Sequence, residues 1–169
     1  MAFTTLPTSY RLTYLSPKEE RDQAVYSIFC EDDNMKYIPF LCRMQSDAWQ
    51  ARRSSHRELF NLGTGAFLDV IETSSGKVIG TSGFRVVDKE NKQAEWGVIL
   101  SQEFQGKGYC KEMHDACIAW AKTQGLERVT AATWQSNDRM NQLLLRYGWT
   151  FIETRTDELG IWNEYELSL

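Results

Sequence analysis

Apolar and polar positions alternate near the start of the chain. Tyr10, Leu12 and Tyr14 recur at every second position, which is the period of a strand with one buried face. Ser16-Pro17-Lys18-Glu19 follows and supplies a helix N-cap, a proline for the first helical position and a glutamate three residues after the cap. We therefore expect a strand over residues 10–15 and a helix that begins at Ser16 and ends before the polar run at residues 31–34. The inward side chains of this helix are Ala24, Val25, Ile28 and Phe29.

A second helix and three strands are predicted next. The helix covers residues 46–62 and ends at Gly63 and Gly65. From residue 66 onward, β-branched and apolar runs cover residues 67–71, 78–87 and 93–100. Two short polar turns separate these runs, so we expect three strands joined by hairpins.

After Leu100 the apolar spacing changes to every third or fourth position, which is typical of a helix. The apolar stripe consists of Tyr109, Met113, Ala116, Cys117, Trp120 and Ala121. We expect this helix to end near Gly125. A strand over 129–134, a short helix over 138–147 closed by Gly148, and strands over 149–154 and 161–169 complete the chain. The order βααβββαβαββ predicts an α/β fold in one domain, residues 1–169, with a mixed sheet covered by helices on both faces.

Composition places the chain among globular proteins and argues against nucleic acid as a partner. Of its 169 residues 42% are hydrophobic, and the net charge of −4 lacks the basic excess that nucleic-acid binding requires. We find no apolar run of membrane-spanning length and no signal peptide, so we expect a cytoplasmic protein without a membrane partner. The four cysteines form no C-x-x-C pair and only two histidines accompany them, so neither a metal site nor a disulfide framework is indicated.

The segment Gln105-Gly106-Lys107-Gly108-Tyr109-Cys110 lies between an apolar strand and an amphipathic helix. Its two glycines allow a tight turn, and the helix behind them offers unpaired N–H groups and a positive dipole end. Such a place attracts phosphate. A nucleotide P-loop is excluded because Gly108 stands where Ser or Thr is needed, and a Rossmann fingerprint fits poorly because Lys111 stands where a small residue is needed. The remaining hypothesis is the pyrophosphate of coenzyme A.

This arrangement resembles the GNAT superfamily of N-acetyltransferases. The superfamily's loop pattern matches Gln105 and Gly108, with Cys110 at its last small position. Residues 94–100 look like its fourth strand, and the helix that begins at Asn137 and runs into Gly148-Trp149 looks like its Asn-x-x-Ser helix, with Met140 in place of Ser. The likeness covers roughly residues 10–155 and is closest to the branch of ribosomal-protein N-terminal and polyamine acetyltransferases.

The resemblance implies a six- to seven-stranded, mostly antiparallel sheet with about four helices, and an enzyme that moves an acetyl group from acetyl-CoA to a primary amine. Its fourth and fifth strands splay apart near a bulge, so the pantetheine arm would pair with the main chain of Val98, Ile99 and Leu100. The pyrophosphate would be held by Gln105, Gly106, Lys107, Gly108, Tyr109 and Cys110. The acceptor would be a small-molecule, polyamine or peptide amine, and the family allows a homodimer.

Only about one alkylamine in a thousand is neutral at pH 7, so the reaction needs a general base that takes the amine proton. The candidate is Glu95, on the strand that leads to the glycine loop. Burial beside Trp96 would raise its pKa and suit it to proton relay, whereas an outward-facing position would make it an ordinary polar residue. Many relatives use a Tyr as the general acid that protonates the departing thiolate, and Leu144 occupies the matching position in this chain. Tyr147 is expected to be a core aromatic, so Asn137 is the candidate donor to the pantetheine or the departing sulfur.

Three further expectations can be tested by the structure. His114 and Cys117 could suggest a thiol nucleophile with its base, but we expect a buried thiol and an exposed imidazole. The six tryptophans are expected to be core residues, with the alternative that Trp49 borders the acceptor cleft. The alternative function is a non-catalytic acyl-CoA-binding or sensor module, which the departures at Cys110, Met140 and Leu144 favour.

Overall fold

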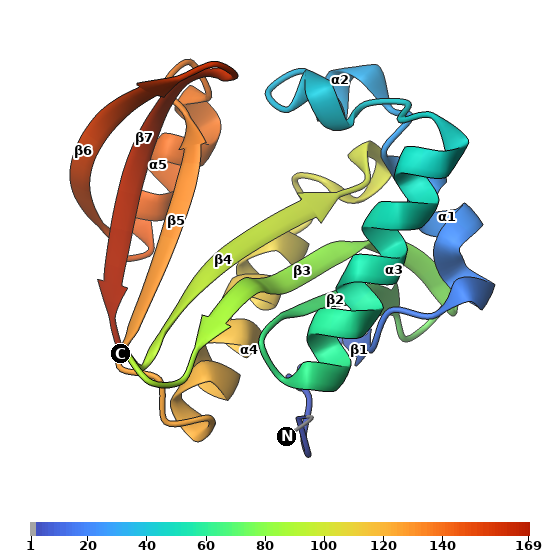
Figure 1. Ribbon diagram of the computed structural model, residues 1–169, viewed down its shortest axis with the longest axis horizontal. Coiled ribbons are helices and arrows are strands. Elements are labelled where there is room, and N and C mark those ends of the chain that lie inside the picture. Colours follow the sequence, from blue (N-terminus) through green and yellow to red (C-terminus); the bar gives the residue numbers. More distant parts are fainter. Residues whose placement is uncertain (1–2) are drawn as a thin grey trace.

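The computed structural model describes residues 3–169 and contains seven strands and five helices in one sheet-and-helix assembly (Figure 1). The strands are β1 (Leu12–Leu15), β2 (Ala66–Glu72), β3 (Lys77–Asp88), β4 (Gln93–Leu100), β5 (Arg128–Trp134), β6 (Thr150–Asp157) and β7 (Gly160–Ser168). The helices are α1 (Asp22–Ile28), α2 (Asp32–Met35), α3 (Ser46–Leu62), α4 (Tyr109–Thr123) and α5 (Asp138–Arg146). Short 3-10 turns cover Glu19–Arg21, Pro39–Leu41 and Gln102–Phe104.

All seven strands form one sheet in the order β1-β2-β3-β4-β5-β7-β6. Every neighbouring pair is antiparallel except β4 and β5, which run parallel. The parallel pairing covers only Gln93 with Arg128, Ala94 with Val129 and Glu95 with Thr130. Beyond these residues the two strands separate, and Figure 1 shows them diverging as the arms of a V. The predicted mixed, mostly antiparallel sheet is confirmed.

Helices cover both faces of the sheet, as the sequence predicted. Figure 1 shows α3 in front of the sheet and α4 behind it. The six apolar residues of the predicted α4 stripe are all buried, at 7% exposure or less. They pack with β1 to β4 side chains in the main core, while α1, α2 and α3 form a second cluster around Phe29, Met35 and Trp49.

Most element boundaries agree with the pattern of the sequence. The helix predicted over residues 46–62 is α3, and Gly63 ends it with φ of 73°, a left-handed conformation that glycine adopts without a Cβ penalty. The strand predicted over residues 93–100 is β4. No helix of residues 3–169 has the length and apolar character needed to cross a bilayer. The same residues bring no three His, Cys, Asp or Glu side chains together as metal ligands would lie.

Predictions at the N-terminal end were partly wrong. Tyr10 lies outside β1 and is 95% exposed, so the strand begins two residues later. The chain is still extended at Lys18, so no helix begins at Ser16, and α1 starts only at Asp22. Ala24 is exposed, and the polar run after α1 forms the short helix α2, whose Met35 is fully buried.

A buried ion-pair network explains why α1 begins late. Arg53 of α3 is 1% exposed and donates hydrogen bonds to Asp22 of α1 and Asp69 of β2. Asp69 also accepts from Arg21 Nε at 2.9 Å, and Asp22 accepts from Arg57 Nη1 at 2.9 Å. Because buried charges must be paired, these contacts fix α1 and α3 on the sheet more strictly than capping signals do.

Replacing Arg53 with Met should lower the free energy of unfolding by about 3 kcal/mol, because two buried carboxylates lose a shared cation. Urea denaturation monitored by circular dichroism measures this change. Arg43→Met is the matched control, because the Arg43–Asp32 pair has side chains 61% and 73% exposed and should contribute little. Equal losses in the two variants would contradict the assigned role of the buried network.

Candidate active site

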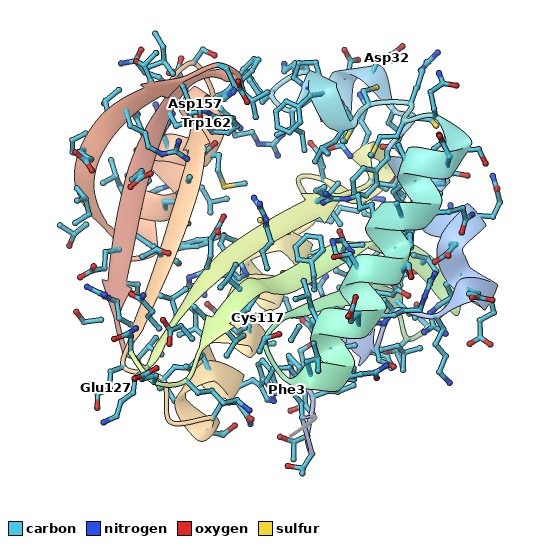
Figure 2. All side chains as sticks on the ribbon, in the orientation of Figure 1. Phe3, Asp32, Cys117, Glu127, Asp157 and Trp162 are labelled. Carbon is cyan, nitrogen blue, oxygen red and sulfur yellow. The ribbon has the colours of Figure 1, made fainter. Side chains whose placement is uncertain are left out.

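A cleft of about 650 Å³ opens where β4 and β5 separate. One wall is formed by β4 and the other by Ala131 to Trp134 of β5, while α2, α3 and α5 contribute further side chains. At its outer end the rings of Phe40 and Trp162 meet with centroids 6.3 Å apart, so the N-terminal and C-terminal parts of the chain touch across the cleft. Trp162 of β7 and Asp32 of α2, both labelled in Figure 2, mark these two sides.

The main chain of β4 is available on its cleft edge beyond Glu95. Residues 96–100 of β4 pair with β3 on one side only. Ser101 N–H donates to Ile79 of β3 at 2.8 Å, so the antiparallel alternation directs the polar groups of Ile99 to β3 and those of Val98 and Leu100 to the cleft. Of the three predicted positions, Val98 therefore presents both main-chain groups there and Leu100 its N–H, because the Leu100 carbonyl accepts from Gln105. Ile99 lines the cleft with its side chain.

The loop before α4 has the conformation that its glycines predict. Gly106 and Gly108 have φ of 75° and 83°, which other residues adopt only with strain. A Cβ on Gly106 would meet no atom within 4 Å, and one on Gly108 would meet only the Arg11 guanidinium at 3.5 Å. Among the described residues, the amides of Gly106, Lys107 and Gly108 donate to no protein group. These amides and the free N–H groups of the first α4 turn form a ready anion site.

Hydrogen bonds on the far side of the loop hold it in place. Gln105 Nε2 donates to the Leu100 carbonyl at 3.0 Å and to Asn34 Oδ1 at 2.9 Å, and its Oε1 accepts from Arg139. Arg11 donates through its main-chain N and its Nε to Glu112, and through Nη1 to the Lys107 carbonyl at 3.2 Å. The Gln105 side chain is therefore used in positioning the loop.

The three remaining loop residues lie in different environments. Lys107 is exposed. Tyr109 is buried and its hydroxyl donates to Glu72 of β2, so its side chain points away from the cleft. Cys110 lines the cleft on the first turn of α4, and burial raises the pKa of its thiol to about 11. It is a neutral thiol at physiological pH.

Glu95 lies at the apex of the V, on the face of β4 that α3 covers. Side chains alternate along β4, so Trp96 packs toward α4, whereas Glu95, Gly97 and Ile99 face α3. A bulge in β3 makes Arg85 an extra residue opposite this point, and its guanidinium lies 3.2 Å from the Glu95 carboxylate. Glu95 thus lines the cleft with a cationic partner, which neither the apolar nor the outward-facing alternative had included.

Asn137 reaches the cleft from the start of α5. Its Oδ1 accepts from the Met140 amide at 3.3 Å and caps the helix, which leaves its Nδ2 as the donor group. Leu144 is 1% exposed and cannot replace a tyrosine acid. Tyr147 packs on His114 with ring centroids 4.7 Å apart, and burial raises the pKa of its hydroxyl to about 12. The expectation that Tyr147 is a packing residue agrees with these contacts.

The expectation of an exposed His114 imidazole was wrong, whereas Trp49 is a core residue, as expected for the tryptophans. His114 is 5% exposed, and its Nε2 accepts from Trp149 Nε1 at 2.9 Å. The aromatic neighbours that bury it come from distant parts of the chain, which the α4 pattern alone did not reveal. Trp49 is also buried, in the cluster of α1 and α3, because tertiary packing directs its ring away from the cleft. Cys117 is buried as expected, and its thiol contacts Ser82.

Sequence reasoning missed several cleft residues. Arg52 of α3 and Arg85 of β3 line the cleft, as do the rings of Phe67, Trp134 and Trp162. No local motif marks them, because they come from separate elements that only the folded sheet brings together. The excess of aromatic residues was visible in the sequence, but it did not distinguish cleft from core.

Comparisons with known proteins identify the family and the fold. The family model described as "Acetyltransferase (GNAT) domain" matches residues 11–150. The uncharacterized N-acetyltransferase YoaA of Bacillus subtilis (strain 168) is 21% identical over 139 residues, which is 82% of this chain and 78% of YoaA.

Two solved structures share the fold. RimL, a ribosomal L7/L12 alpha-N-protein acetyltransferase in complex with coenzyme A, has a TM-score of 0.83 at 16% identity and covers 97% of each chain. MccE, the microcin C7 self-immunity acetyltransferase in complex with acetyl-CoA and AMP, has a TM-score of 0.82 at 19% identity, over 95% of this chain and 94% of MccE. The family model spans most of the sheet and both motifs around the cleft, and the chain therefore belongs to the GNAT acetyltransferases.

Proposed function

We propose that this chain is an acetyl-CoA-dependent N-acetyltransferase that moves the acetyl group directly to a primary amine. The observation that carries the proposal is one continuous cleft that joins Gly106 and Cys110 of the glycine loop, the free edge of β4 and Glu95. The coenzyme A and acetyl-CoA complexes of RimL and MccE support the same cofactor for this chain.

The binding roles follow from which groups lack protein partners. The amides of Gly106, Lys107, Gly108, Tyr109 and Cys110 would hold the pyrophosphate, with the positive end of α4 behind them. Val98 would pair with the pantetheine arm through its N–H and carbonyl, and Leu100 through its N–H, beside Ile99. Gln105 acts as a positioning residue, since its side chain already holds the loop.

The chemical step is attack of a neutral amine on the thioester carbonyl. The C–N bond forms, the amine proton passes to Glu95 directly or through water, and the C–S bond breaks to release the thiolate. A β4 main-chain amide would stabilise the oxyanion, and Asn137 Nδ2 would donate to the departing sulfur, which takes its proton from solvent. This assignment needs no tyrosine at position 144.

The proposal includes a cytoplasmic location and a homodimer. Strand β6 supports the homodimer for two reasons: it lies at the edge of the sheet with one unpaired side, and its side chains Phe151 (46%) and Ile152 (52%) are exposed. Light scattering of the purified chain should give twice the chain mass, and Ile152→Lys should shift it toward the monomer. A monomeric wild-type chain at micromolar concentration would contradict the dimer.

The direct test of the function is thiol release from acetyl-CoA in the presence of a panel of amines. Acetylated amine and free thiol should appear in equal amounts, because one transfer produces both. Coenzyme A binding by calorimetry, without thiol release from any amine, would instead favour the non-catalytic sensor.

Replacing Gly108 with Val should raise the dissociation constant of coenzyme A by about tenfold or more, roughly 1.4 kcal/mol, because a branched side chain blocks close approach to the loop amides. Isothermal titration calorimetry measures it. Gly125→Val is the matched control, since Gly125 follows the other end of α4 with φ of 74° and open space around it. Unchanged affinity in a folded Gly108→Val chain would count against the site.

Replacing Glu95 with Gln should reduce the transfer rate most at low pH, where the acceptor amine holds its proton and needs a base. The deficit should shrink as pH approaches the pKa of the amine. Rate profiles from about pH 6 to pH 10 with one alkylamine measure it. Arg85→Gln is the control, because it breaks the same ion pair and keeps the carboxylate. A deficit that is constant across pH would remove Glu95 from proton transfer.

A further inference from the structure

Lys36, Arg52 and Arg139 line the cleft without a carboxylate partner among the described residues, and of these three only Arg52 has a buried polar atom without a hydrogen bond. α3 carries three neighbouring arginines, and two of them, Arg53 and Arg57, pair with Asp22. Arg52 lines the cleft, and no ion pair or hydrogen bond joins its guanidinium to the described residues. Its guanidinium makes a cation–π contact with Phe29, with 5.7 Å from Cζ to the ring centroid. Because a half-buried guanidinium without an anion is costly, this position suggests a ligand group that completes it.

A second polar atom near Arg52 is also without a partner. Arg52 Nε and His56 Nδ1 are both buried and make no hydrogen bond in the structure. The two residues lie one turn apart on α3, and so on the same helix face. The His56 ring packs on Phe67, with centroids 5.4 Å apart, and Phe67 lines the cleft. Two unsatisfied groups on one helix face beside the cleft point to a polar ligand group there.

The protonation states of the two side chains fit an anionic ligand. Burial, assisted by the charges of Arg85 and Arg53, lowers the pKa of Arg52 to about 10, so it remains a cation at neutral pH. Burial and the four surrounding arginines lower the pKa of His56 to about 3, so its ring is neutral and can donate one hydrogen bond. Arg52 therefore offers an anionic ligand group a positive charge, and His56 offers it a neutral hydrogen-bond donor.

The charges of the cleft leave this cation uncompensated. Its acidic lining residues are Asp33 and Glu95, and its basic ones are Lys36, Arg52, Arg85 and Arg139. Glu95 already pairs with Arg85 at 3.2 Å, and Asp33 lies on α2 close in sequence to Lys36. An acceptor with several positive charges would therefore meet a surplus of guanidinium groups, whereas an anionic group on the acceptor would neutralise one.

Arg52 of α3 and the proposed base Glu95 of β4 line the same cleft. Glu95 and Gly97 face α3, and a Cβ on Gly97 would lie 3.2 Å from Phe67 and 3.8 Å from Arg85. Phe67 therefore lies between the β4 strand and the α3 side chains. We propose that the acceptor is a primary amine that also carries a carboxylate or phosphate, and that Arg52 binds this anionic group while the amine lies at Glu95. This inference rests on the proposed acetyl transfer and names its substrate class.

Matched acceptors test the inference. Straight-chain ω-amino acids from β-alanine to 6-aminohexanoate would be compared with their carboxamides, whose amines have similar basicity when the chain is long. Aminoalkyl phosphates of the same lengths distinguish a phosphate from a carboxylate, and spermidine represents the polycations. At least one anionic acceptor should have kcat/KM about tenfold or more above its amide and above spermidine.

Variants identify the residue responsible. Arg52→Gln should raise KM for the preferred anionic acceptor by about tenfold or more, with unchanged KM for acetyl-CoA and for the neutral amide. Arg52→Lys should recover part of the loss by restoring a point charge. Arg128→Gln is the control, because Arg128 pairs with Glu166 at the surface and lies outside the cleft.

The outcomes separate this inference from the proposed function. Acetylation of amides and polyamines at rates equal to the anionic acceptors would overturn the inference and leave the acetyltransferase assignment standing. If no amine is acetylated, the proposed function fails, and titration of N-acetylated ω-amino acids into the chain with coenzyme A still tests the anion site. Binding that Arg52→Gln weakens would support the site, and equal binding of acids and amides would overturn it.

Discussion

The short pairing between β4 and β5 is the constraint on which the site depends. Two parallel strands that separate after three residue pairs leave main-chain donors and acceptors without partners on both inner edges. Such groups are tolerated only where water or a ligand satisfies them. The same separation lets α2, α3 and α5 place side chains between the strands, so one change in pairing provides both the cofactor groove and the acceptor side of the cleft.

Features encoded by local sequence were predicted well. The α4 stripe, the glycine that ends α3 and the strand β4 depend on the spacing of residues that lie close together in the chain. The family prediction was also confirmed, by the family model that matches residues 11–150. The glycine loop could be predicted for the same reason, since its backbone conformation follows from Gly106 and Gly108 themselves.

Features that depend on distant partners were not predictable in this way. The late start of α1 follows from ion pairs with Arg53 and Asp69, and the burial of His114 follows from Trp96, Tyr147 and Trp149. Family resemblance gave positions but not what each side chain does there. Gln105 and Tyr109 lie in the predicted loop, yet their side chains hold protein partners, and the roles of Glu95 and Asn137 stay predictions.

Arg11, the residue before β1, donates to the Lys107 carbonyl and so joins the start of the chain to the loop before α4, across 96 residues of sequence. Because this bond and the two that Arg11 makes to Glu112 join protein groups only, they restrict the loop, and less conformational entropy is lost when a diphosphate binds. A natural variant that loosens the N-terminal strand would then weaken cofactor affinity without altering any atom that touches the cofactor. Divergence at the start of the chain can therefore tune substrate saturation in a cell, independently of the residues that carry out the transfer.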